Sequence, residues 1–407
     1  MSNVILIIGA MIFLAHFLAL LFRRTNLPDV LVLMGVGLVS GPLMGWVNPD
    51  YFGKAGPVMA TVALVVILFE GGTSLQIEVV RRALATTGRL TFGCFLLTGI
   101  IVSSVGYLML DLQPWPAALL GIILAGTSSA VVIPMVNSLK PSEGAGTALV
   151  LESALTDVLS IVGVFTLIQV ITQGNVSVGP LLGNVLSALL FAIFIGVLGG
   201  AGWLMILGRV RDFPNTISST IAYAFIVYGI TDGLGFSGAI AAMALGITLT
   251  NFETMGLKRL RWLNHDVEAL TAVDRAFYSE AVFLLKTYFF VYLGMSIRFN
   301  GTLVLVAALT MTVLVVLMRT GLTRRVFASN RYSLRDSALV SVLSPKGLAA
   351  AVLATVPLQH GVHGAEIIRD AAYMVVLVSI TVCAVLVALL PFSPVQRLWG
   401  VVLGKQS

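Results

Sequence analysis

Long apolar runs dominate the chain, and short polar stretches separate them. Because a helix needs about 20 apolar residues to cross a bilayer, the pattern predicts an all-α polytopic membrane protein with about 13 transmembrane helices. With 58% apolar and only 10% charged residues, the composition agrees. The thirteen apolar segments are residues 3–22, 30–47, 57–75, 89–110, 116–137, 145–172, 181–208, 217–231, 236–251, 279–297, 302–325, 334–356 and 369–391.

The basic residues alternate between the two sides of this predicted arrangement. Of the 24 Lys and Arg residues, 18 lie in odd-numbered loops or the C-terminal tail, and three lie in even-numbered loops. Basic residues concentrate on the cytoplasmic side of membrane proteins. We therefore expect a multi-pass protein of the inner (plasma) membrane, with its N-terminus outside and its C-terminus in the cytoplasm.

The polar stretches are too short for a second domain. We expect a single transmembrane domain over residues 1–407, without a soluble regulatory domain. Residues 252–278 mix basic, acidic and apolar side chains, which is typical of an amphipathic segment at the cytoplasmic membrane surface; a solvated loop is the alternative. The charge pattern gives no reason to expect nucleic-acid binding.

Two apolar segments contain helix-breaking residues at mid-membrane depth. Gly126–Ala130 interrupts the fifth segment, and Ser344–Gly347 interrupts the twelfth. Unwound backbone is tolerated in a bilayer only where it is buried in protein or lines a water-filled cavity. One interruption in each half, entered from opposite sides, predicts two inverted repeats with crossed broken helices. A kinked helix is the alternative for the fifth segment.

The sixth segment carries acids and hydroxyls on neighbouring faces. From the cytoplasmic end, Glu152 lies about 10 Å deep and Asp157 about 18 Å deep. Ser153 is four residues before Asp157 and shares its face, and Thr156 lies on the adjacent stripe. Ionisable residues inside a membrane segment mark a functional site by default; a purely structural ion pair is the alternative for Asp157.

Depth brings further polar residues to the same level. Glu70, Thr127 and Lys346 all fall near Asp157 by residue counting. Glu70 either belongs to this pocket or reaches the membrane surface. An acidic site lined by hydroxyls suits a small hard cation, and Lys346 can neutralise the negative ends of half-helices. Lys286, about 10 Å deep, either extends to the surface or pairs with a buried carboxylate.

Three motifs resemble the monovalent cation/proton antiporters, which include bacterial sodium/proton antiporters and animal sodium/proton exchangers. They are ILFEGG at 67–72, ESALTDVLSI at 152–161 and SPKGLAAAVLA at 344–354. The resemblance implies that Asp157 is the cation- and proton-binding carboxylate, that Ser153 is a ligand and that Glu70 is a nearby acid. It also implies a Glu152–Lys346 ion pair, a homodimer and alternating access.

The sequence departs from this family in two places. Thr127, Ser128 and Ser129 stand where the sodium/proton branch often has Thr-Asp-Pro, and they look more like the potassium-efflux branch. Thr156 replaces an Asn or Asp. We place Thr127, Ser128 and Thr156 in the candidate site, with Asp157, Ser153 and Thr127 as the metal-ion ligands, and we keep both Na⁺ and K⁺ as candidates, with Na⁺ favoured.

The resulting hypothesis is a secondary antiporter, and not an enzyme, with no cofactor beyond the transported ions. A proton and a monovalent cation compete for Asp157, and one cation per proton, without net charge, is the favoured stoichiometry. A Lys286 that releases a second proton would make transport electrogenic. The alternative is a sodium-coupled symporter of an organic anion; a channel is disfavoured because no repeated filter sequence is present.

Overall fold

The structure is a computed structural model. All its regular secondary structure, within the described residues, is helical. Seven of these helices are long and apolar enough to cross a membrane, and four shorter apolar helical stretches accompany them. The predicted all-α polytopic fold is confirmed, whereas the count of 13 spans and the inverted repeats stay predictions. The described residues are 9, 12–13, 16–17, 28–46, 55–173, 178–210, 216–256, 270–299, 302–326 and 332–404, so most of the first predicted segment lies outside them.

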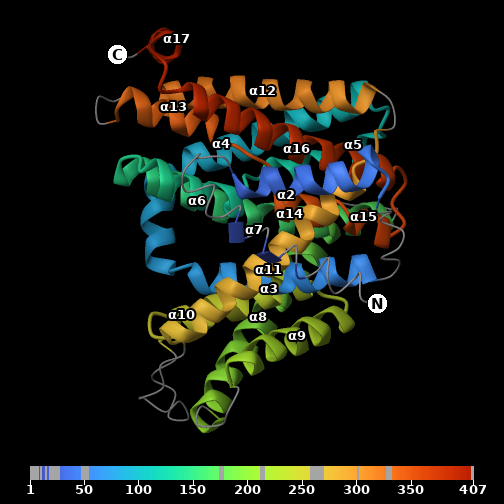
Figure 1. Cartoon of the computed structure of the whole chain (residues 1–407). Coiled ribbons are helices and arrows are strands. Elements are labelled where there is room, and N and C mark those ends of the chain that lie inside the picture. Colours follow the sequence, from blue (N-terminus) through green and yellow to red (C-terminus); the bar gives the residue numbers. More distant parts are fainter. Residues whose placement is uncertain are drawn as a thin grey trace. The chain divides into compact units, whose positions relative to one another are not determined.

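The larger of two compact units, unit 1, comprises Met1–Gly56, Ala83–Thr172 and Thr287–Ser407. Within it, α12 and α16 pack along each other, and α13 packs against both (Figure 1). The helices that lie wholly or mostly in unit 1 are α2 (Asp29–Leu38), the π-helix η1 (Val39–Leu43), α4 (Ile77–Met109), α5 (Pro114–Ala125), α6 (Ser129–Leu139), α7 (Glu143–Gln173), α12 (Thr302–Val326), α13 (Leu334–Val342), α14 (Leu348–Leu353), α15 (Val356–Gln359), α16 (Ala365–Leu389) and α17 (Ser393–Leu403).

The smaller unit, unit 2, comprises Pro57–Arg82 and Gln173–Lys286. It contains α8 (Val178–Val210), α9 (Thr216–Gly233), α10 (Gly238–Asn251) and nearly all of α3 (Ala55–Ser74). The first part of α11 (Ala272–Ser296) also belongs to it. Its core includes Phe69, Trp203 and Leu245.

Two glycines let α3 and α10 of unit 2 approach closely. A Cβ on Gly72 would collide with the carbonyl oxygen of Met243, and one on Gly246 would collide with that of Phe69. Small residues permit such close crossings of membrane helices. Gly72, two residues after Glu70, is therefore explained by helix packing.

The amide of Asn251, at the end of α10, holds the link between α3 and α4. Its Nδ2 donates to the carbonyl oxygens of Leu75 (2.7 Å) and Ile247 (2.8 Å), and its Oδ1 accepts the Ile77 N–H (2.8 Å). Asn251 is only 4% exposed. Backbone N–H and C=O groups inside a protein need hydrogen-bond partners. The Asn251 side chain supplies such partners to the link, where no helix provides them.

Both predicted helix interruptions are present in unit 1. The fifth apolar segment forms α5 and α6, separated by residues 126–128, and the twelfth forms α13 and α14, separated by 343–347. Pro134 lies inside α6, so the glycine and not this proline marks the break. The crossing of the two broken helices stays a prediction.

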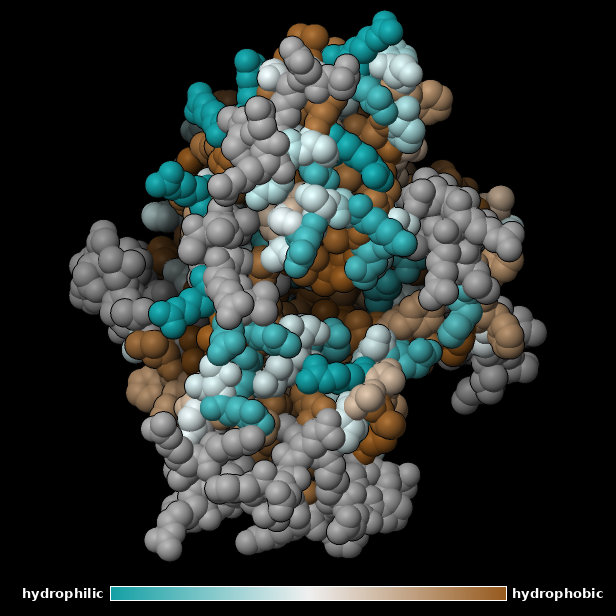
Figure 2. All heavy atoms as spheres, turned by 90° about the vertical axis from the view of Figure 1, so that its left-hand side faces the viewer, coloured by the Kyte–Doolittle hydropathy of each residue, from teal (hydrophilic) through white to brown (hydrophobic). Residues whose placement is uncertain are grey.

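The start of α13 is tied to the link between α6 and α7. Ser333 caps α13 by accepting the Asp336 N–H (3.0 Å), and Asp336 Oδ1 accepts the Ser142 N–H (3.0 Å). Arg335 Nη2 donates to the carbonyl oxygen of Leu139 at 2.8 Å. Figure 2, which shows the left-hand side of the view in Figure 1, has many hydrophilic side chains on this face. The hydrogen bonds of Asp336 and Arg335 thus join the start of α13 to the end of α6 and the link that follows it.

About half of the predicted interfacial segment 252–278, namely residues 257–269, lies outside the described residues. Residues 252–256 form turns directly after α10, and α11 begins at Ala272 within the other end of the segment. An amphipathic helix does occur elsewhere: α17 follows the last long apolar helix, where we expected only a short tail.

Candidate functional site

The two helix interruptions of unit 1 touch each other. The backbone N–H of Ser128 donates to the carbonyl oxygen of Pro345 at 2.8 Å. A Cβ on Gly347 would overlap the side chain of Ser128, so only glycine fits there. Residues from the fifth and twelfth apolar segments thus form one non-helical junction. Some backbone groups that have no partner within a helix form hydrogen bonds across this junction.

The acid-bearing face of α7 lies against this junction. Ser129, the first residue of α6, donates its hydroxyl to Asp157 Oδ2 at 2.7 Å. The Thr127 N–H donates to Thr156 Oγ1 at 3.1 Å, and the two threonine hydroxyls lie 3.4 Å apart. Thr127 therefore contacts Thr156, and the neighbouring Asp157 contacts Ser129, so these two residues of α7 meet the interruption and the start of α6.

Three other predicted site residues have different contacts. The Ser153 hydroxyl donates to the carbonyl oxygen of Val150 on its own helix at 2.8 Å. Ser128 takes part through its backbone. Glu70 belongs to unit 2, where Ser74 Oγ donates to its carboxylate at 3.4 Å. The roles of Ser153, Ser128 and Glu70 as ligands stay predictions, as does that of Lys286, which is buried on α11.

Ser129 is the contact of Asp157 that sequence reasoning did not single out. It stands third in the hydroxyl run that marks the interruption, so its residue type was noticed but its partner was not. Its position at the start of a half-helix inside the predicted membrane region was the sequence signal that could have indicated a role in the site. Its hydroxyl also provides an oxygen beside the carboxylate, which suits a hard cation.

The predicted ion pair between Glu152 and Lys346 is wrong, because Glu152 pairs with Arg319 of α12. Arg319 Nη1 and Nη2 contact the two carboxylate oxygens, the Nη2–Oε2 distance being 2.7 Å. The side chains of Arg319 and Glu152 are 2% and 1% exposed. The guanidinium fork fits a carboxylate better than an ammonium does. Arg319 Nε also donates to the Val340 carbonyl oxygen at 2.6 Å, which ties α13 to the pair.

Residue counting could have found this partner. Arg319 lies seven residues from the end of α12, or about 10 Å, which equals the depth counted for Glu152. Lys346, at about 17 Å, lies deeper. The depth argument thus favoured Arg319, and the mistake came from choosing the residue within a recognised motif.

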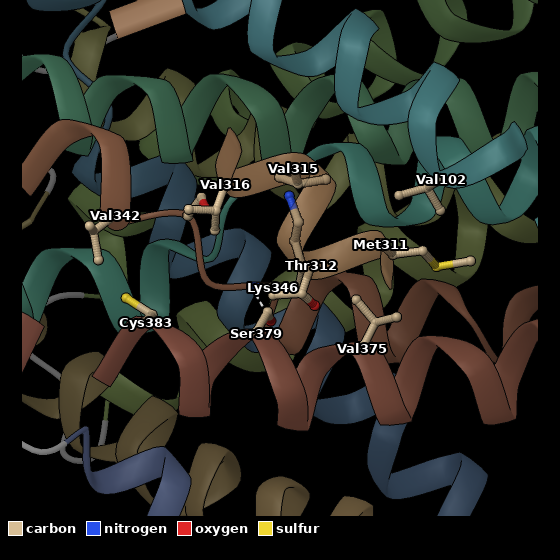
Figure 3. Close-up of a pocket in the computed structure, with 11 residues that line it drawn as sticks. Val102, Met311, Thr312, Val315, Val316, Val342, Lys346, Val375, Ser379 and Cys383 are labelled. Atoms are coloured by element: carbon tan, nitrogen blue, oxygen red, sulfur yellow. Dashed lines mark hydrogen bonds between the residues drawn. The ribbon is translucent and has the colours of Figure 1, made fainter. Parts of the chain in front are cut away.

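Lys346 instead serves the junction. Its Nζ donates to the carbonyl oxygen of Gly126 at 2.9 Å, directly after the last residue of α5. Its backbone N–H donates to Ser379 Oγ of α16 at 3.0 Å, and its side chain extends away from Ser379 (Figure 3). A positive charge at the negative end of a helix is favourable. The expected neutralisation of a half-helix end is therefore seen at α5.

A small, mostly apolar pocket lies beside Lys346. Its walls come from α4, α12, α16 and the second interruption (Figure 3). Valines supply much of the lining, and the polar contributions include Thr312 and Ser379. The Lys346 side chain thus has an apolar wall on one side and the Gly126 carbonyl oxygen as the partner of its Nζ.

Comparison with known proteins shows the family of this chain. The family described as sodium/hydrogen exchanger, transmembrane, matches residues 10–391. The chain belongs to this family. It is therefore a multi-pass membrane protein built on a transporter framework.

Two relatives have low sequence identity to this chain. The K⁺/H⁺ antiporter NhaP2 of a Shewanella species is 26% identical over 372 residues, covering 88% of this chain and 61% of the relative. The Na⁺/H⁺ antiporter 1 of Methanocaldococcus jannaschii is 26% identical over 321 residues, covering 72% and 68%. The chain thus spans less than two thirds of the length of the K⁺/H⁺ relative.

A solved structure of the sodium proton antiporter MjNhaP1 from Methanocaldococcus jannaschii has the same fold. The TM-score is 0.75 at 20% identity, with 94% of this chain and 99% of that chain covered. The family's fold therefore extends over nearly the whole chain.

Proposed function

We propose that this protein is a secondary antiporter that exchanges a monovalent cation for H⁺ at Asp157. The observation that carries the proposal is the Asp157 carboxylate beside the Ser129 hydroxyl, at the junction of two helix interruptions. The buried cations Arg319 and Lys346 of unit 1 have other partners, Glu152 for Arg319 and the Gly126 carbonyl oxygen for Lys346. Family membership supports the same reading.

Exchange follows from competition for one carboxylate. A carboxylate inside a membrane is costly to leave charged and unpaired. Asp157 can be neutralised by a proton or by a cation, and occupation by one excludes the other. If the site changes its exposure only when neutralised, a proton gradient drives the cation in the opposite direction.

The ligands of the cation are proposed from the oxygens near Asp157. Asp157, Ser153 and Thr127 are the predicted direct ligands, and the contact with Asp157 adds Ser129 to them. Ser128, Thr156 and Glu70 complete the predicted site. Carboxylate, hydroxyl and carbonyl oxygens suit Na⁺ and K⁺ equally in type, so selectivity depends on how closely they converge.

Na⁺ remains the favoured cation and K⁺ the second candidate. The named relatives include antiporters of both kinds. Neither the family nor the named relatives support the alternative of a sodium-coupled symporter. Flux into proteoliposomes with each cation in turn distinguishes Na⁺ from K⁺.

The family resemblance also leads us to propose a homodimer in the plasma membrane. The bias of basic residues supports an external N-terminus and a cytoplasmic C-terminus. Native mass spectrometry of the purified protein tests the dimer. Accessibility of single cysteines introduced into loops of intact cells tests the orientation.

The decisive experiment is proton flux in proteoliposomes that contain the Asp157→Asn variant. An acid-sensitive dye should report no cation-dependent proton movement. Asp232→Asn, which changes an exposed carboxylate, is the matched control and should transport normally. Ser129→Ala should raise KM for the cation by about tenfold, because a hydrogen bond to a charged group is lost. Full activity of Asp157→Asn would refute the proposal.

A further inference from the structure

The helix α17 packs on unit 1 through one apolar edge. Val395, Trp399 and Leu403 follow each other at four-residue intervals, so they lie on the same face. Leu403 is 4% exposed and the other two are partly buried. This edge contacts α12 and α13. This edge attaches α17 to α12 and α13. The other sides of α17 do not take part in this packing.

A second apolar face of α17 is uncovered. Leu398 is 62% exposed, Val401 78% and Val402 39%, and Phe392 just before the helix is also exposed. At 100° per residue, these helical side chains lie next to the packed edge, and Gln396 and Arg397 occupy the remaining polar side. A helix with one packed edge, one bare apolar face and one polar face is suited to a boundary between water and a second apolar medium.

Basic residues surround the same helix. Arg324 and Arg325 form the last turn of α12, and Arg397 is exposed on α17 itself. The Arg324 guanidinium lies beside Gly404, the left-handed residue that ends α17, with Nη2 3.6 Å from where a Cβ would be. Arg324 thus stands at the negative end of α17, where a cation is favourable.

The orientation of α17 fits the surface of a bilayer. In Figure 1, α17 is seen nearly end-on, whereas α12 and α13 run across the view. Because α12 is long and apolar enough to span a membrane, a helix that crosses its end lies along the membrane surface. Leu317, nine residues before the end of α12, is 62% exposed, and the apolar Val326 at that end is 37% exposed. The bare face of α17 therefore continues a lipid-facing surface.

We propose that α17 is an interfacial helix that binds anionic phospholipid. Leu398 and Val401 enter the boundary between headgroups and acyl chains, and Arg324, Arg325 and Arg397 contact the phosphates. Amphipathic helices at membranes combine apolar insertion with attraction to anionic lipid in this way. A phosphate without acyl chains would engage the arginines alone and would not need the apolar face.

Spin labels test the insertion. Labels are placed at 398, 401 and 396 by Leu398→Cys, Val401→Cys and Gln396→Cys in proteoliposomes; the native Cys94 and Cys383 are both buried. Labels at 398 and 401 should be accessible to oxygen and shielded from a water-soluble nickel chelate, and the label at 396 should show the reverse. Equal nickel access at 401 and 396 would overturn the proposal. Strong spin–spin broadening at 401 would do the same, because it would mean that a second copy covers this face.

Thermal stability in nanodiscs tests the lipid charge. Phosphatidylglycerol should raise Tm relative to phosphatidylcholine, and the double variant Arg324→Gln/Arg397→Gln should lose at least half of that rise. Arg298→Gln, which removes an exposed cation from the segment after α11, is the matched control and should keep it. Inorganic phosphate added to phosphatidylcholine nanodiscs should not reproduce the rise. Retention of the full rise by the double variant, or its reproduction by phosphate alone, would contradict lipid binding.

Discussion

The backbone N–H of Ser128 donates to the carbonyl oxygen of Pro345 at 2.8 Å, so a main-chain hydrogen bond joins two helix interruptions that are far apart in the sequence. The bond does not depend on the side chains of either residue. Its geometry is instead set by how closely the two chains approach, and Gly347 decides that approach.

A side chain at position 347 should force the junction apart. Gly347→Ala places a Cβ on the Ser128 side chain, and overpacking of this kind costs about 1–3 kcal/mol. We expect a lower Tm and slower transport. The double variant Gly347→Ala/Ser128→Gly removes the collision and should recover most of the lost stability. Gly229→Ala, where a Cβ meets nothing within 4 Å, controls for the change in residue type. Failure of the double variant to recover would show that the collision is not the cause.

The buried pair of Glu152 and Arg319 should behave as a coupled unit. Removal of one partner leaves a buried charge, which costs roughly 3–5 kcal/mol. Glu152→Gln and Arg319→Met should each lower stability strongly, and the double variant should lose clearly less than the two losses combined. Denaturation in detergent measures the four proteins of this cycle.

Arg369 and Asp370 provide the comparison for that cycle. They form a 2.7 Å ion pair that is partly exposed, and such pairs contribute about 0–1 kcal/mol. Coupling between Glu152 and Arg319 no larger than this would argue against the role given to Arg319.

The amide of Asn251 should matter for the stability of unit 2. Its three hydrogen bonds, two of them to the link between α3 and α4, are each worth about 1 kcal/mol. Asn251→Leu should therefore destabilise the protein by about 3 kcal/mol. Hydrogen exchange should rise at Ile77 in particular, because its N–H loses its acceptor. Asn137→Ala, at an exposed position of α6, should change neither quantity.

Transport should carry no net charge. Thr156 precedes Asp157 and cannot exchange a proton near neutral pH, so one carboxylate handles one cation or one proton. Currents on a solid-supported membrane should be absent, and flux should not respond to an imposed potential. A current that disappears in Lys286→Gln but persists in Lys140→Gln, a change at an exposed lysine, would show that Lys286 supplies a second proton.

Local chemistry allowed much of this protein to be predicted from its sequence. Apolar runs determine which residues can lie in lipid, and the Gly, Ser and Pro residues at 126–130 and 344–347 determine where a helix cannot continue. Asp157 stands out because a carboxylate at that depth is expensive. Each of these properties belongs to a short stretch of chain.

The partners of each group depended on the tertiary structure. Residue counting along a helix gives depth, but it does not give the direction in which a side chain points toward other helices. For that reason Ser129 and not Ser153 donates to Asp157, and Arg319 and not Lys346 binds Glu152. The bare face of α17 likewise became visible only once packing showed which of its apolar residues the protein covers. The sequence pattern predicts the depth of each residue in the membrane, whereas the packing of the helices determines which residues it contacts.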